Sequence, residues 1–275
     1  MDALALALVL VAAVAHAGWN LLAKQAGGGV AFVWLYTIVA VVLWAPVAAL
    51  DAHGVTWAGV GFMAGSGVLH AAYFAALQHA YSIGDLSVVY PLARGTGPVL
   101  SVAAAVLVLG ERPGPLALAG GLLIVGAVLM LAGGRRAPGR GAAVLTGVFI
   151  AAYTVWDAHA VKALDQPPVA YFWGAILVQA ALLTPFGLRD RRALRASAVA
   201  DRWRVIGIAI LSPLSYVLVL AALARAPVSL VAPAREGSVV LGAFLGTRVL
   251  GEGHATRRIV AAAAIAVGIV GLAIG

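Results

Sequence analysis

Ten apolar segments of similar length dominate this chain of 275 residues. A helix needs about 20 consecutive apolar residues to cross the hydrocarbon core of a bilayer. Only 10% of the residues are charged, against about 25% in a typical soluble domain. We therefore expect an all-α integral membrane protein with ten transmembrane helices. The predicted spans are 3–23, 30–50, 55–78, 86–109, 115–132, 142–161, 168–188, 203–224, 228–249 and 257–274.

The basic residues predict how the chain is oriented. The net charge is +8, but the basic residues lie in short loops between apolar runs, which argues against a nucleic-acid-binding face. Thirteen Lys and Arg residues follow the odd-numbered spans, and three lie in the opposite loops. The positive-inside rule then places both termini outside the cytoplasm. It places the Arg-rich loops 133–141 and 189–204 inside the cytoplasm, in a multi-pass protein of the cell (plasma or inner) membrane. Met1-Asp2 lacks the positive charge of a signal peptide, so we expect the first span to be retained.

The second half of the sequence repeats the first. Arg94 and Arg235 lie 141 positions apart, and so do Glu111 and Glu252. Trp34 and Trp173 are separated by 139 positions. The offset differs from 141 by two residues, a change that insertions or deletions in the loops would cause. Because each half holds five spans, the second half enters the membrane from the opposite side, which predicts two inverted five-helix repeats. The predicted units are a first repeat at 1–133, a basic linker at 134–140 and a second repeat at 141–275.

Arg94 and Arg235 are the most unusual residues of the spans. An arginine at the centre of a membrane helix costs about 2.5–3.5 kcal/mol, so a chain that carries two at equivalent places is expected to use them. Two roles remain open and compatible. Each arginine could pair internally, Arg94 with Asp157 or Arg235 with Glu236. Each could instead bind a substrate carboxylate or phosphate, which guanidinium groups hold bidentately.

Other polar side chains on the same spans are candidates for a central site. Helical periodicity places Tyr90 and Arg94 on one face, whereas Glu236 is expected to point about 100° away from Arg235. Asp157 and Glu236 are candidate proton-coupling groups, because burial can keep a carboxyl group protonated. An interfacial belt for the tryptophans and interhelical bonding for His16 are the alternatives. The candidate substrate-binding residues are His16, Trp19, Asn20, Ser66, His70, Tyr90, Arg94, Tyr153, Trp156, Ser212, Tyr216 and Arg235.

The sequence contains no motif of a soluble enzyme. It lacks a His-Glu-x-x-His zinc motif, a P-loop lysine and a Gly-x-Ser-x-Gly nucleophile turn. It contains no cysteine, which excludes disulfides and thiolate metal sites. We therefore expect neither catalysis nor a cofactor nor a metal.

The motifs of the two halves resemble the drug/metabolite transporter superfamily in its ten-span EamA-type branch. In the first half the resemblance is carried by the runs 76–80 and 90–92, by 109–111 and by Gly126. In the second half it is carried by 222–226, 232–233, 250–252 and Gly268. The resemblance covers nearly the whole chain as two EamA-like units. It implies an inverted-repeat bundle with a central cavity lined mainly by the first, third, fourth, sixth, eighth and ninth spans, and export or exchange of a substrate.

These observations predict a secondary active transporter, in the direction of export. Its substrate would be a small polar metabolite, such as a carboxylate-bearing amino acid, moved by alternating access. The alternatives are efflux of organic cations by the same fold, and a non-transporting scaffold or lipid-modifying membrane protein. The expected partners are the small-molecule substrate and the lipid bilayer, with no nucleic acid. Proton coupling and a monomeric or homodimeric assembly are both compatible with this prediction.

Overall fold

The computed structural model describes residues 1–275 except 27–28, 85, 133–137, 239–240 and 242–254. The described residues form helices and connecting turns, and none of them lies in a β-strand. The helices are α1 (Ala3–Lys24), α2 (Val30–Asp51), α3 (Trp57–Ile83), α4 (Leu86–Leu107), α5 (Pro115–Ala132), α6 (Arg140–Lys162), α7 (Pro168–Gly187), α8 (Arg191–Ala200), α9 (Arg202–Leu223), α10 (Val228–Ala234) and α12 (Ala255–Ile274).

Most predicted spans coincide with a helix. Six helices, α1, α2, α3, α6, α7 and α9, are long and apolar enough to cross a membrane. Shorter apolar stretches lie within α4, α5 and α12, at Leu92–Leu107, Pro115–Met130 and Val260–Ile274. The predicted span 228–249 begins as α10, and most of its remainder lies outside the described residues. The same holds for Glu252 and for most of the predicted linker 134–140. The chain is thus an all-helical, multi-pass membrane protein, and the count of ten spans remains a prediction.

The outer surface is apolar, as a lipid-facing surface must be. Leu122 on α5 is 69% exposed, Val42 on α2 66% and Val267 on α12 63%. Exposed apolar side chains spread over several helices would be an aggregation hazard in water, whereas hydrocarbon solvates them.

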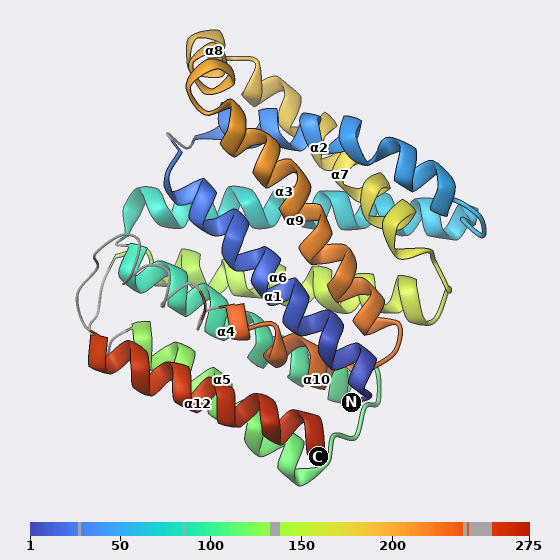
Figure 1. Ribbon diagram of the computed structural model, residues 1–275, viewed down its shortest axis with the longest axis vertical. Coiled ribbons are helices and arrows are strands. Elements are labelled where there is room, and N and C mark those ends of the chain that lie inside the picture. The colour runs from blue at the N-terminus through green and yellow to red at the C-terminus, as the bar shows by residue number, and fades with distance from the viewer. Residues whose placement is uncertain (27–28, 85, 133–137, 239–240, 242–254) are drawn as a thin grey trace.

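The helices connect at two opposite ends of the bundle (Figure 1). One end holds the two termini and the connections α2–α3, α4–α5, α6–α7 and α9–α10, and we call this end the terminal face. We call the other end of the bundle the opposite face. α8, which connects α7 to α9, lies at the opposite face. α8 is a short helix within the Arg-rich segment 189–204, and Asp190 begins it by accepting a hydrogen bond from the Ala193 amide at 2.9 Å.

The long helices pack across the two halves of the chain. α1 packs on α9, α3 on α6, α2 on α7 and α5 on α12, so the core is built largely from contacts between the halves. Small residues permit close approach of the backbones. A Cβ atom added to Gly147 on α6 would lie 2.6 Å from the Thr96 Cβ on α4, so only glycine fits at this crossing.

Two carboxylates of the first half cap helices of the second half at the terminal face. Asp51 at the end of α2 accepts hydrogen bonds from the amides of Val169 and Ala170, at 2.9 and 3.1 Å. Glu111 accepts hydrogen bonds from the amides that begin α10, Val228 at 2.8 Å and Ser229 at 2.9 Å. These amides have no acceptor within their own helix, so each carboxylate supplies a missing partner and also favours the positive end of the helix dipole.

Candidate functional site

A cavity of about 130 Å³ lies between the packed helices. The side chains that line it come from α1, α2, α3, α4, α6, α7 and α9, and from Arg235 directly after α10. Aromatic rings form much of the wall, with a few hydroxyl, amide and imidazole groups between them. The lining residues with polar or aromatic side chains are His16, Trp19, Tyr36, Thr37, His70, Tyr73, Phe74, Arg94, Tyr153, Phe172, Gln179, Ser212, Ser215, Tyr216 and Arg235.

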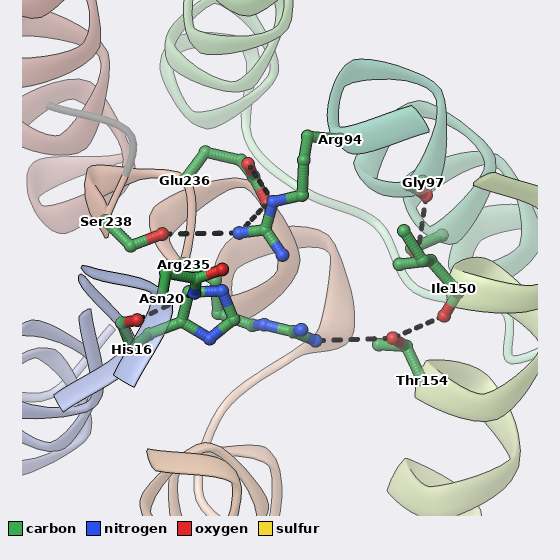
Figure 2. A network of polar contacts seen from close by, with 10 residues as sticks. His16, Asn20, Arg94, Gly97, Ile150, Thr154, Arg235, Glu236 and Ser238 are labelled. Carbon is green, nitrogen blue, oxygen red and sulfur yellow. Dashed lines mark hydrogen bonds and ion pairs between the residues drawn. The ribbon is translucent and has the colours of Figure 1, made fainter. Parts of the chain in front are cut away.

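Arg235 brings a positive charge to the cavity. It follows the last residue of α10 and is only 9% exposed. Its Nη1 donates to the Thr154 hydroxyl at 3.4 Å, and its guanidinium carbon lies 5.6 Å from the centroid of the Tyr216 ring. The Thr154 hydroxyl donates to the Ile150 carbonyl, which leaves its oxygen free to accept from Arg235 (Figure 2). Among the described residues, no carboxylate pairs with Arg235.

Arg94 also lines the cavity, but its charge is matched by Glu236. The Nε of Arg94 donates to one Glu236 oxygen at 3.1 Å, and Nη2 lies 3.0 Å from the other oxygen (Figure 2). Nη2 also donates to the Ser238 hydroxyl at 3.2 Å. The side chains of Arg94 and Glu236 are both buried, so this is a bidentate ion pair inside the protein.

The ion pair differs from both pairings expected from the sequence. The expectation assumed a regular helix, on which Glu236 would point about 100° away from Arg235. After α10 ends at Ala234, the amide of Glu236 instead bonds to the Pro233 carbonyl, and the amide of Ser238 bonds to the Arg235 carbonyl. These three-residue bonds form a tighter turn than an α-helix. As a result, Glu236 and Ser238 both reach Arg94.

Asp157 is fully buried on α6 and does not line the cavity. One of its oxygens accepts from the Tyr171 hydroxyl at 2.7 Å, and the other accepts from the Tyr216 hydroxyl at 2.6 Å. Two phenols thus satisfy this carboxyl group. Tyr216 contributes its ring to the cavity wall and its hydroxyl to Asp157.

His70 and the rings around it form the aromatic wall of the cavity. The imidazole stacks on Tyr153 with centroids 4.2 Å apart and meets Tyr216 edge-on at 5.2 Å. Ser66 lies one turn earlier on α3, is fully buried and holds the His70 Nδ1 at 3.3 Å. Ser66 therefore positions a lining residue and is not itself part of the cavity wall.

Two tryptophans predicted for the site lie in different surroundings. Trp19 lines the cavity and packs edge-on against His16, with ring centroids 4.9 Å apart. Trp156 is 37% exposed and lies outside the cavity, where it stacks on Phe62 and donates to the Phe62 carbonyl at 2.9 Å.

Of the other predicted site residues, Ser212 lines the cavity, whereas the Asn20 amide donates to the His16 carbonyl of its own helix at 2.7 Å. The backbone of Tyr90 belongs to α4, and its side chain lies outside the described residues.

Residues from α2 and α7 complete the cavity, and none of them was among the site residues predicted from the sequence. Thr37 on α2 and Gln179 on α7 carry the signal that could have identified them, since each is a polar residue within an otherwise apolar span. The aromatic residues Tyr36 and Phe172 carry no such signal, because aromatic residues are common throughout membrane helices. In the described part of the chain, no group of three or more metal-binding side chains comes together.

Comparison with known proteins identifies the fold and a domain. Residues 138–274 match a protein family described as the EamA-like transporter family. A solved crystal structure with 18% sequence identity superposes with a TM-score of 0.83, and the match covers 100% of this chain and 98% of the other. At this identity the likeness shows the fold alone. No curated protein sequence matches the chain.

Proposed function

The chain belongs to the EamA-like transporter family through residues 138–274, and on this premise we propose that it is a secondary active transporter of a small carboxylate-bearing metabolite. The substrate would cross the membrane through the central cavity by alternating access. Amino acids and other small organic acids fall in this class. The resemblance to the drug/metabolite transporter superfamily implies export or exchange, and of the two we propose export.

Arg235 is the observation that carries this proposal. A buried guanidinium is costly unless a partner compensates it. Arg235 has one described hydrogen-bond acceptor, the Thr154 hydroxyl, and lies over the face of the Tyr216 ring. Arg94, by contrast, already holds the carboxylate of Glu236. A substrate carboxylate in the cavity would bind Arg235 through two hydrogen bonds, as the Glu236 carboxylate binds Arg94.

The packing supports the proposed inverted repeats at 1–133 and 141–275. If α1 corresponds to α6 and α3 to α9, the contact of α1 with α9 has its counterpart in the contact of α6 with α3. α2 then meets its own counterpart α7, and α5 meets α12. α1 starts at the terminal face and α6 starts at the opposite face, which is the reversal that an inverted repeat requires (Figure 1).

Efflux of organic cations is less compatible with the cavity. The described lining carries the positive charge of Arg235 and no aspartate or glutamate. The two candidate carboxylates are occupied, Asp157 by two phenols and Glu236 by Arg94. We retain Asp157 and Glu236 as candidates for proton coupling. If transport by Asp157→Asn and Glu236→Gln responded to a pH gradient as the parent does, neither carboxyl group would be the coupling site.

Counterflow in proteoliposomes tests the proposed function. Vesicles loaded with unlabelled small carboxylates, including 3-methylbutanoate and valine, would be assayed for uptake of the labelled compounds. We expect the parent protein to catalyse counterflow of at least one of them, and Arg235→Gln to lose it. Arg225→Gln is the matched control, since Arg225 is exposed in the turn after α9. Full counterflow by Arg235→Gln would contradict the role of the cavity arginine.

A further inference from the structure

The short helix α8 presents three arginines on one side. Arg191, Arg192 and Arg195 are all exposed, and the helical period places them within an arc of about 100°. Ser197 lies on the other side of the helix and is buried, at 8% exposure. α8 packs on α2 and α9. One side of α8 is therefore held against the protein, and the other side carries the three arginines, which we call the arginine face.

The Arg-rich segment holds more positive charge than its own carboxylates can balance. Residues 189–204 contain six arginines and two aspartates. Asp190 accepts a hydrogen bond from the Ala193 amide at the start of α8. Asp201 forms an ion pair with Arg204, beyond the other end of α8. An anionic partner from outside the chain would balance the remaining charge.

The position of α8 indicates that this partner comes from the membrane surface. α8 connects α7 to α9, both of which are long and apolar enough to span a membrane, at the opposite face (Figure 1). Val199 in the last turn of α8 is 75% exposed, and Trp203 in the first turn of α9 is 72% exposed. Exposed tryptophans of membrane proteins concentrate at the boundary between hydrocarbon and headgroups. These side chains therefore place α8 at the depth of the lipid headgroups.

Arginine is well suited to bind a phosphate at this depth. A guanidinium group binds phosphate oxygens through two parallel hydrogen bonds. The apolar stem of the side chain can contact lipid while its charged end reaches the headgroup. Arg202 shows a related arrangement, since its guanidinium carbon lies 5.4 Å from the centroid of the Trp203 ring. Basic clusters beside a membrane helix attract anionic lipids in particular.

We infer that the arginine face of α8 is a binding site for the phosphate group of an anionic phospholipid in the adjacent leaflet. The bound lipid holds α8 against the bilayer and thereby stabilises the connection between α7 and α9. This inference concerns the membrane surface, so it depends neither on the proposed function nor on which side of the membrane α8 lies.

Hydrogen exchange of the parent protein in bilayer discs tests the inference without any variant. Discs of phosphatidylcholine alone are compared with discs that also contain phosphatidylglycerol, since both lipids carry a phosphate but only the second has a net negative charge. We expect the amides of residues 193–200 to exchange at least about fivefold more slowly with phosphatidylglycerol, the effect of about one arginine at an anionic surface. Val169 and Ala170 at the terminal face serve as internal controls and should not change. Equal exchange of α8 in the two kinds of disc would overturn the inference.

A triple variant tests the role of the arginine face. Arg191→Gln/Arg192→Gln/Arg195→Gln removes three charges, and glutamine has nearly the helix propensity of arginine, so α8 should still form. The protection by phosphatidylglycerol should fall to about onefold. If the triple variant kept the parental protection, the lipid would bind elsewhere and the inference would be wrong.

The matched control removes the same charge from the terminal face. Arg112→Gln/Lys162→Gln/Arg225→Gln changes three exposed basic residues there and should keep the parental protection of α8. Loss of that protection in the control would show that only the total charge matters, which would also contradict a site on α8.

Soluble anions distinguish the lipid from other sources of negative charge. Glycerol 3-phosphate supplies the phosphate without the bilayer, and polyglutamate stands in for an acidic protein. Neither should slow the exchange of α8 in phosphatidylcholine discs as phosphatidylglycerol does. Equal protection by either of them would assign the arginine face to a soluble partner and overturn the inference.

Discussion

At the scale of single residues, the ion pair between Arg94 and Glu236 joins the two halves of the chain. Both partners are buried, at 6% and 2% exposure, so each charge depends on the other. Removing one member of a buried pair leaves an uncompensated charge, at a cost of about 3–5 kcal/mol. Replacing both members by apolar residues removes that cost.

Variants of this pair give a prediction for stability. Arg94→Met and Glu236→Leu should each lower the thermal unfolding temperature of the detergent-purified protein, and the double variant should recover most of the loss. Ser238→Ala is the control for the weaker hydrogen bond to Arg94 and should lower the temperature least. A double variant that is as unstable as the sum of the single variants would contradict a paired, buried interaction.

The position of the two arginines could be predicted from the sequence, but their partners could not. The offset of 141 identifies Arg94 and Arg235 as equivalent residues in apolar surroundings. Their partners depend on the tight turn after Ala234, which turns Glu236 toward Arg94. Residues 235–238 contain one glycine, Gly237, and no proline. In a chain with 33 glycines, a single glycine does not signal a turn. A helical projection is therefore wrong at the residues that matter most.

At the scale of helices, one carboxylate cap of the terminal face joins α2 to α7. Asp51 on α2 holds the first amides of α7, Val169 and Ala170. Loss of a helix cap costs about 1 kcal/mol, which corresponds to about fivefold in the opening equilibrium of those amides.

Hydrogen exchange measures this effect directly. In Asp51→Ala, the amides of Val169 and Ala170 should exchange about fivefold faster, with little change at α8. Asp190→Ala is the reciprocal control, because Asp190 caps α8 through the Ala193 amide. It should accelerate exchange at the start of α8 only. Unchanged exchange at Val169 in Asp51→Ala would show that the cap does not hold α7.

The crossing of α4 and α6 gives a second prediction at this scale. In Gly147→Ala the new Cβ would meet the Thr96 side chain at 2.6 Å, so the helices must separate, at a cost of about 1–3 kcal/mol. Gly141→Ala lies on the same helix with no atom within 4 Å of the new Cβ, and it should be neutral or stabilising. Thermal unfolding of the two variants provides the comparison. Equal unfolding temperatures would contradict the close crossing.

The length and position of most helices could also be predicted, because an apolar run of about 20 residues has few alternatives in a membrane. The short helix α8 could not be predicted as an element. It lies in a segment whose charge excludes a membrane span but is equally compatible with a loop. Its start depends on the Asp190 cap, a single side chain within a run of arginines.

At the scale of the whole molecule, the two faces of the bundle carry different charge. The arginines of α8 lie at the opposite face, and the termini lie at the terminal face (Figure 1). The positive-inside rule predicts that the opposite face is cytoplasmic and the terminal face is external.

Labelling of single cysteines tests this orientation, since the natural chain contains no cysteine. His53→Cys lies in the exposed connection between α2 and α3, and Ala196→Cys lies on an exposed position of α8. In intact cells a membrane-impermeant thiol reagent should label His53→Cys and should label Ala196→Cys only after the membrane is opened. The reverse pattern would invert the predicted orientation.

The central cavity could be predicted in outline at this scale but not in full. The repeat and the polar faces of α1, α3, α6 and α9 indicated a shared site, and His16, His70, Tyr153 and Tyr216 do line one cavity. Which polar residues face the cavity depends on the packing of neighbouring helices. Asp157 was a candidate from the sequence, and the structure places it behind Tyr216, where two phenols satisfy it.

The central claim is that Arg235 binds a substrate carboxylate in this cavity, and a structure of the protein with bound 3-methylbutanoate tests it most directly. The account predicts ligand density within the cavity, with a carboxylate oxygen about 2.7–2.9 Å from the Arg235 guanidinium and the Arg94–Glu236 pair intact. A ligand bound outside the cavity, or inside it with its carboxylate away from Arg235, would contradict the claim.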